Sequence, residues 1–286
     1  MAVSSDEVVK TFARSIDASE RHDKPYRHWN LRHCLPAAAI DDMLALPFPA
    51  PELDGISGKR ELHNNTRRYF DVENRGKFAV AEAVSAAFQD KRTTSKIERD
   101  FGTKLAGTHL RIELAQDVDG FWLEPHTDLG VKLFTLLIYT SKDKEHHDLG
   151  TDIYDAEKTH VGRSPFASNS ALVFIPSSIT YHGFEPRPIK GVRKSVIINY
   201  VSSEWRAREQ LALGVEGLQC PVDRLAADHF AEMAQDRGLV RVHGIRPREA
   251  AADRVRDQRR LDLAGPVAHE PLVHSVRGPG RTSSRH

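Results

Sequence analysis

Two histidines and an aspartate are spaced along the chain in a way that suits a metal site. The stretch WLEPHTDLG places His126 and Asp128 two residues apart, directly before the apolar run LFTLLIYT. In an extended segment residues i and i+2 point to the same face, so the two side chains converge on one point. A facial metal site needs a third ligand, commonly another histidine, and His182 in SITYHGFEP lies in a later strand-like segment.

An arginine and a serine follow the second histidine in the segment RKSVIINY. Strand alternation puts Arg193 and Ser195 on one face and Lys194 on the other. An arginine inside an otherwise apolar strand needs a partner, and this segment contains no acidic residue. A bound dicarboxylate would provide that partner.

Each of these features has a simpler explanation when it is taken alone. A capped turn can produce a His-x-Asp pair, and a lone His182 is more often a hydrogen-bonded core histidine than a ligand. The stretch KEHHDLG competes as a ligand source, but neighbouring strand residues point to opposite faces, which makes a poor chelator. We therefore predict a loop for its three candidate ligands, His146, His147 and Asp148.

The candidate ligands lie in a part of the chain that is rich in predicted strands. Between about residues 107 and 201, short segments rich in Val, Ile, Leu, Tyr and Phe are bounded by Gly, Pro, Ser or Asp: THLRIELAQ, KLFTLLIYTS, TDIYD, SALVFIPS, TYHGFE and RKSVIINYV. Short strands at close spacing predict an antiparallel sandwich or jelly roll. Neither a GxGxxG nor a GxxxxGK[ST] motif occurs, which argues against nucleotide-binding folds.

The preceding residues are predicted to be mainly helical and to pack outside the strands. The helical segments are SSDEVVKTFARSI, LPAAAIDDMLAL and GKFAVAEAVSAAFQDK. Between the last two, the polar stretch 53–76 is predicted to be a surface loop or, alternatively, a substrate-binding loop. The second interpretation depends on its hydrogen-bonding residues Asn64, Asn65, Arg67, Arg68 and Tyr69.

These patterns divide the chain into three parts. We predict N-terminal helical support over residues 1–104, a β core over 105–205 and a C-terminal segment over 206–286. The last segment has dense arginine and no lysine, includes a possible helix at DRLAADHFAEMAQDRG, and is otherwise predicted to be disordered.

Composition limits the classes of partner and the compartment. The 41 Lys and Arg nearly balance the 40 Asp and Glu, so no overall charge favours nucleic acid or an acidic membrane. Cys34 and Cys220 are distant and lack CxxC spacing, as in reduced intracellular proteins. The start of the chain has no apolar signal core, and no run approaches the roughly 20 apolar residues that span a bilayer. We expect a soluble, cytoplasmic protein.

Taken together, the His-x-Asp pair, the distal histidine and the Arg-x-Ser pair resemble the Fe(II)/2-oxoglutarate-dependent oxygenase superfamily, over roughly residues 105–205. The pattern is similar to its prolyl-hydroxylase-like or small-molecule hydroxylase branch. The resemblance implies a double-stranded β-helix, a cupin-like jelly roll, with flanking helices. It also implies that His126, Asp128 and His182 hold Fe(II), and that Arg193 and Ser195 hold the distal carboxylate of 2-oxoglutarate.

The activity implied by the resemblance is hydroxylation of an unactivated carbon with O2, which releases succinate and CO2. The nucleic-acid-repair branch has a different arginine pattern, and halogenating members lack the metal carboxylate that Asp128 supplies here. A small polar molecule is therefore the expected substrate, with Asn65, Arg67, Arg68 and Tyr69 as candidate contacts. Two alternatives remain: a zinc-dependent hydrolase that uses the same three ligands, and a cupin-like binding protein without catalysis.

Overall fold

The computed structural model describes residues 2–53, 58, 67–128 and 130–212. The chain separates into two units, Met1–Pro221 and Val222–His286, and the second lies wholly outside the described residues. The predicted C-terminal helix and the predicted disordered tail also lie outside them, as do Asn64 and Asn65.

The described part of the chain contains two antiparallel sheets. The seven-stranded sheet has the order β1 (Glu20–His22), β2 (His28–Arg32), β9 (Ser170–Phe174), β6 (Lys132–Tyr139), β11 (Arg193–Val201), β4 (His109–Asp117), β3 (Arg67–Tyr69). The four-stranded sheet has the order β5 (Leu123–His126), β10 (His182–Phe184), β7 (Asp152–Tyr154), β8 (His160–Arg163).

Strands β4 to β11 pair in a nested pattern. The outermost pair is β4 with β11, followed inward by β5 with β10, β6 with β9, and β7 with β8, all antiparallel. The first and third of these pairs lie in the large sheet, and the second and fourth lie in the small one. This double ribbon folded over itself is a jelly roll, and it confirms the predicted double-stranded β-helix.

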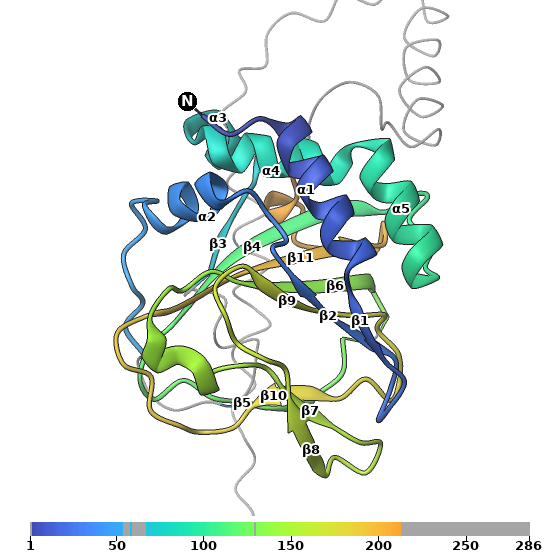
Figure 1. The fold of residues 1–286 in the computed structure, drawn as a ribbon, viewed down its shortest axis with the longest axis vertical. Coiled ribbons are helices and arrows are strands. Elements are labelled where there is room, and N and C mark those ends of the chain that lie inside the picture. Colours follow the sequence, from blue (N-terminus) through green and yellow to red (C-terminus); the bar gives the residue numbers. More distant parts are fainter. Residues whose placement is uncertain (1, 54–57, 59–66, 129, 213–286) are drawn as a thin grey trace, which may run out of the picture. The chain divides into compact units, whose positions relative to one another are not determined.

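Five helices cover the outer face of the large sheet, on the side away from the small sheet (Figure 1). They are α1 (Ser5–Asp17), α2 (Ala37–Leu44), α3 (Val72–Lys77), α4 (Ala79–Gln89) and α5 (Lys91–Phe101). Phe12 of α1 packs on Phe88 of α4, with ring centroids 4.8 Å apart, and the Tyr200 hydroxyl of β11 donates to the Phe88 carbonyl. The helices thus bury the apolar outer face of the sheet and leave its inner face to line the barrel.

Alternation along β4 and β11 sorts side chains between the helices and the barrel interior. Leu114 and Val196 are register partners in the helix-covered core, whereas the flanking positions face the interior. The predicted alternation of β11 is confirmed: Arg193 faces inward, and Lys194 reaches the Leu44 carbonyl of α2. The interior thus receives an unusual number of polar side chains from these strands.

The N-terminal region is less purely helical than we predicted. It contributes β1, β2 and β3 to the large sheet. In β2, Trp29 and Leu31 join the helix-covered core, while His28 and Asn30 lie on the inner face. Because two of its residues are polar, the sequence of this segment does not have the apolar character by which strands were predicted. The stretch 53–76, predicted to be a loop, contains β3 and α3, because its last residues pair with the edge of β4.

Two smaller differences occur within the core. KEHHDLG forms a 3₁₀ helix, η2 (Lys144–Asp148), in place of the predicted loop. Strand β8 was not predicted, because only its pairing with β7 makes the polar segment His160–Arg163 extended. A second 3₁₀ helix, η3 (Arg208–Gln210), follows β11.

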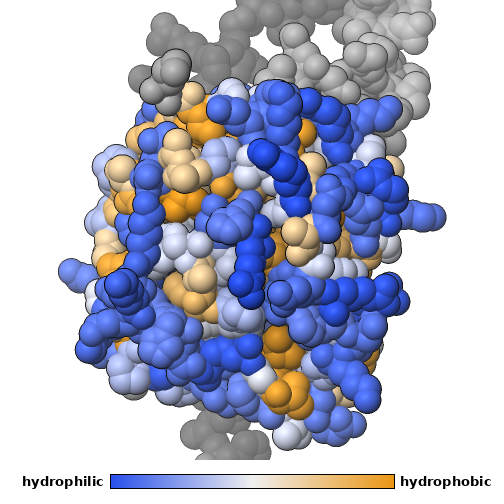
Figure 2. Space-filling view, viewed as in Figure 1, coloured by the Kyte–Doolittle hydropathy of each residue, from blue (hydrophilic) through white to orange (hydrophobic). Residues whose placement is uncertain are grey.

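The visible surface offers no large apolar patch. Figure 2 shows a mostly hydrophilic face with small, separate apolar areas. Within the described ranges, the large apolar side chains that are exposed are Val72, Val161 and Ile179, which come from different segments. None of the described helices is both long and apolar enough to span a bilayer.

Candidate metal centre

The structure brings the three predicted metal ligands together inside the barrel. One ligand atom from each of His126, Asp128 and His182 lies within 4.8 Å of the other two. Asp128 and His182 are buried and His126 is half-buried. Two imidazole nitrogens and one carboxylate with this spacing can chelate a single metal ion.

Pairing of β5 with β10 creates the histidine pair. His126 and His182 are direct register partners, and their ring centroids lie 4.3 Å apart. Gly183 makes this approach possible, because a Cβ there would lie only 2.7 Å from the Leu123 carbonyl oxygen. The His-Gly sequence therefore both supplies the ligand and lets its strand lie close to β5.

Backbone carbonyls orient both imidazoles. The Nδ1 atom of His126 lies 2.9 Å from the Glu124 carbonyl oxygen, and that of His182 lies 3.1 Å from the Thr180 carbonyl oxygen. With Nδ1 protonated to make these hydrogen bonds, the lone pair on Nε2 of each ring is available to a metal. Burial, with a further effect of the His126 imidazole, lowers the pKa of His182 to about 3, so this ring is neutral at physiological pH.

Asp128 is held by two side chains of the large sheet. Lys132 Nζ donates to its Oδ1 at 2.6 Å, and Thr135 Oγ1 donates to its Oδ2 at 3.1 Å. Oδ2 is also the oxygen that faces His182 Nε2, at 3.9 Å. These two donors therefore orient the carboxylate, with Oδ2 turned toward His182.

A single pocket extends from these ligands into the barrel. It has an empty volume of about 550 Å³, including space open to solvent. Along β6, Thr135 contacts the candidate ligand Asp128, and Tyr139, four residues later, is the register partner of Ser195. Four residues of strand span roughly 13 Å, which is the distance along β6 from Thr135 to Tyr139. Both Arg193 and Ser195 line the pocket together with the three candidate ligands.

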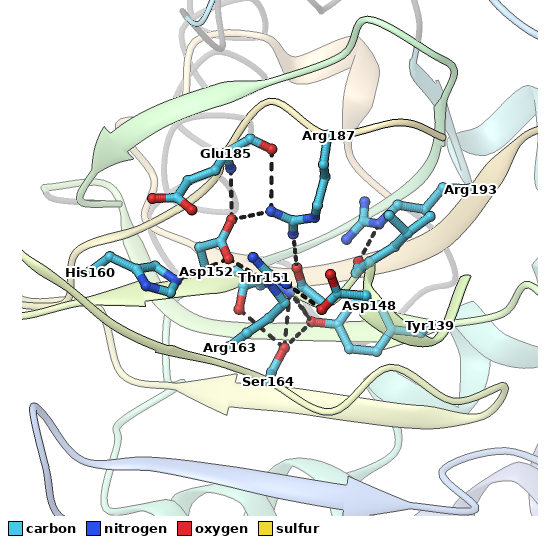
Figure 3. Close-up of polar contacts among 12 residues, drawn as sticks. Tyr139, Asp148, Thr151, Asp152, His160, Arg163, Ser164, Glu185, Arg187 and Arg193 are labelled. Atoms are coloured by element: carbon cyan, nitrogen blue, oxygen red, sulfur yellow. Dashed lines mark hydrogen bonds and ion pairs between the residues drawn. The ribbon is translucent and has the colours of Figure 1, made fainter. Parts of the chain in front are cut away.

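Arg193 has a protein partner that the sequence analysis did not anticipate. Its Nη1 donates to Asp117 Oδ2, and its Nε donates to the Leu149 carbonyl at 2.7 Å (Figure 3 shows the second bond). Asp117 lies on β4 directly opposite Arg193. The neighbouring strand thus already supplies one partner for Arg193, and binding of a dicarboxylate by Arg193 stays a prediction. Among the described residues, Nη2 has no hydrogen-bond acceptor.

The candidate substrate residues are divided by strand alternation. Arg67 is buried, lines the pocket and donates to Asp117 Oδ1 at 3.1 Å. Arg68 pairs in register with Leu114 of the helix-covered core, and so it points away from the pocket. Tyr69 stacks on Arg111, whose guanidinium carbon lies 4.8 Å from the ring centroid. Only Arg67 of these three residues lines the pocket.

A second group of possible ligands lies in the small sheet but is already occupied by arginines. Asp152, His160 and Glu185 also come within the distance expected for ligands. Arg163 donates to Oδ1 of Asp152 and Arg187 to Oδ2, each at 2.6 Å (Figure 3). Two guanidinium groups beside one carboxylate repel a metal cation, so this group joins strands and does not bind metal.

Sequence reasoning missed three charged or polar residues that shape the site: Asp117, Lys132 and Thr135. A signal for the first was available. Arg111, Glu113 and Asp117 fall on one face of a strand whose other face carries Leu110, Ile112 and Leu114, which indicates a charged interior. Lys132 and Thr135 carry no such signal, since a lysine and a threonine at a strand start are ordinary surface residues.

Comparisons with known proteins give a fold likeness only. No family model matches the chain, and no curated protein matches its sequence. Solved structures that resemble it include a prolyl 4-hydroxylase from Phytophthora capsici, with 13% identity, 80% of this chain and 75% of that chain covered, and a TM-score of 0.47. A Pseudomonas putida prolyl-4-hydroxylase is 15% identical, with 68% of this chain and 98% of that chain covered and a TM-score of 0.45.

HygX from Streptomyces hygroscopicus, solved with nickel and 2-oxoglutarate bound, is 11% identical to this chain. The match covers 63% of this chain and 84% of HygX, with a TM-score of 0.41. At such low identity and TM-score, these proteins do not show what the present site binds. Its residues have to be judged by their own geometry.

Proposed function

We propose that this protein is an Fe(II)- and 2-oxoglutarate-dependent dioxygenase that hydroxylates an unactivated carbon of a small polar molecule. The observation that carries the proposal is one pocket with two ends. His126, Asp128 and His182 lie at one end, and Arg193 and Ser195 line the same space further along. A metal that leaves coordination positions open, together with a distant cation, suits a cosubstrate that chelates through one end and carries a carboxylate at the other.

The residues present fit this metal and cosubstrate. The Nδ1 atoms of the two imidazoles are fixed by backbone carbonyls, which leaves Nε2 of each ring as the metal donor, and Asp128 would offset metal charge. Arg193 has Nη2 available for the distal carboxylate of 2-oxoglutarate, and Ser195 lies beside it as a second donor. When bound, the iron and the cosubstrate supply O2 activation, with succinate and CO2 as products. The protein contributes ligand orientation, a largely buried pocket and a cation for the far carboxylate.

The two alternatives receive less support. A zinc hydrolase needs a general base near the metal-bound water. Apart from Asp128 itself, the carboxylate among the pocket-lining residues is Asp117, whose two oxygens already accept hydrogen bonds from Arg67 and Arg193. A non-catalytic barrel would not need an ordered set of metal ligands oriented from behind by hydrogen bonds.

Succinate formation tests the proposal. Protein loaded with Fe(II) without oxygen is given 2-oxoglutarate and O2, alone and with a panel of small polar metabolites, and succinate is measured. We expect slow succinate formation that a true substrate stimulates, and none from His182→Ala or from zinc-loaded protein. If zinc-loaded protein hydrolyses ester or amide substrates and the iron-loaded form makes no succinate, the hydrolase is the correct alternative. Iron binding without any turnover would favour a binding protein.

A further inference from the structure

Five buried charged residues form an alternating chain across the interior of the barrel. The Arg111 guanidinium lies 2.5 Å from Glu113, and Glu113 lies 3.5 Å from Arg67. Arg67 in turn pairs with Asp117 at 3.1 Å, and Asp117 pairs with Arg193. None of the five is more than 7% exposed. They come from three adjacent strands, with Arg67 on β3, Arg193 on β11 and the rest on β4.

Counted over these five described residues, the charge chain Arg111–Glu113–Arg67–Asp117–Arg193 has three guanidinium groups and two carboxylates, a net of one positive charge. A net charge is costly inside a protein unless an ion of opposite sign offsets it. Asp117 divides its two oxygens between Arg67 and Arg193, so it neutralises neither arginine completely. If Arg67 were absent, Asp117 would belong to Arg193 alone and the chain would have no net charge.

We propose that Arg67 is a positioning residue for the 2-oxoglutarate site: by sharing Asp117, it leaves Arg193 with the positive charge that binds the distal carboxylate. This inference rests on the proposed function and adds a residue outside the predicted β core. It gives β3 a specific task, which is to extend the large sheet by one strand so that a second arginine reaches Asp117. The Arg67 guanidinium also lies 5.6 Å from the ring centroid of Phe121, another pocket residue, which fixes its direction.

Equilibrium dialysis of labelled 2-oxoglutarate against anaerobic, Fe(II)-loaded protein measures the effect without turnover. Arg67→Met should weaken binding at least about tenfold, because one unit of charge is lost near the carboxylate in a buried site. Arg68→Met is the matched control, since the neighbouring arginine points away from the pocket, and its affinity should stay within about twofold of wild type. In turnover, Arg67→Met should raise the KM for 2-oxoglutarate and change kcat little.

A double variant separates charge sharing from a merely structural role. Arg67→Met with Asp117→Asn restores one net positive charge, so it should bind 2-oxoglutarate more tightly than Arg67→Met alone. A structural role predicts the reverse, because the second change removes another buried contact. Asp117→Asn alone should bind at least as tightly as wild type. If Arg67→Met does not fold, as judged by a cooperative melting transition, the affinity of Asp117→Asn for 2-oxoglutarate tests the charge-sharing role.

The outcomes distinguish this inference from the proposed function. If wild-type protein does not bind 2-oxoglutarate, the proposed function fails. If wild type binds, Arg193→Leu does not, and Arg67→Met binds as well as Arg68→Met, the proposed function stands and the role of Arg67 is wrong. A double variant weaker than Arg67→Met, or a weakened Asp117→Asn, would also overturn it.

Discussion

At the scale of single residues, neighbouring positions on one strand have different tasks. Arg193 and Ser195 line the pocket, whereas Lys194 between them donates to the Leu44 carbonyl on the helix side of the sheet. The difference follows from strand alternation alone. It therefore supplies an internal control for any experiment on the pocket.

We expect this control to be visible in the dependence of turnover on 2-oxoglutarate. Arg193→Leu removes one partner of a buried charge pair, which costs about 2–5 kcal/mol, a loss in apparent affinity of about 30-fold or more. Ser195→Ala removes one neutral donor and should cost about 1–3 kcal/mol. Lys194→Ala should leave the half-saturating concentration nearly unchanged. If Lys194→Ala has a larger effect than Arg193→Leu, the assignment of these residues is wrong.

The histidines allow a second comparison at this scale. Iron bound to anaerobically reconstituted protein is measured by metal analysis. His126→Ala and His182→Ala should each lose most of about one equivalent of iron, because two remaining ligands seldom retain Fe(II). His147→Ala should retain it, since this exposed histidine contacts the Lys144 carbonyl in η2. If both His126→Ala and His182→Ala keep their full iron content, the metal binds at another site.

At the scale of elements, Asp152 holds the small sheet together. It lies on β7 and accepts hydrogen bonds from Arg163 of β8, and from Arg187 and the Glu185 amide, which follow β10 (Figure 3). Burial alone would raise the pKa of Asp152. Hydrogen bonds from Arg187, the Glu185 amide and Arg163 outweigh burial and hold the pKa below its ordinary value. The same interactions fix β10, which carries His182.

Asp152→Asn should lower the free energy of unfolding by about 3 kcal/mol at neutral pH, because it leaves the partly buried Arg187 without its carboxylate partner and Arg163 with only the exposed Asp148. The folded-state pKa of Asp152 is depressed, so its contribution is complete above the unfolded-state pKa of about 3.9 and is lost as pH falls through the folded-state value. Denaturant unfolding at several pH values should therefore show the deficit of the variant shrinking below about pH 4. Glu157→Gln, at an exposed position on the turn after β7, is the control and should change stability little. A deficit independent of pH would show that the charge of Asp152 is not the cause.

At the scale of the whole molecule, ligand binding should couple to stability. A ligand present at 100 times its Kd stabilises the folded state by about 2.7 kcal/mol, a rise in melting temperature of about 5–10 °C for a domain of this size. We expect Fe(II), added anaerobically, to raise the melting temperature of wild type but not of His182→Ala. 2-Oxoglutarate should add a further rise only when metal is present, and Arg193→Leu should lose that second rise alone. An equal rise from 2-oxoglutarate without metal would place its binding site away from the triad.

The sequence by itself determined the strands of the core, the grouping of its candidate ligands and the side of β11 on which Arg193 lies. These depend on local periodicity, since side chains alternate in a strand whatever lies beside it. The short strands β3 and β8 could not be read in this way, because only pairing with a neighbouring strand makes them extended.

Only the tertiary structure decided which charges meet. Asp117 is far from both Arg67 and Arg193 in sequence, and it becomes their shared partner because β4 lies between β3 and β11 in the large sheet. In the same way, Lys132 and Thr135 of β6 are the partners of Asp128 in the folded structure. A charge in a sequence indicates that a partner is needed. The identity of the partner depends on strand order, which the residues of one segment do not encode.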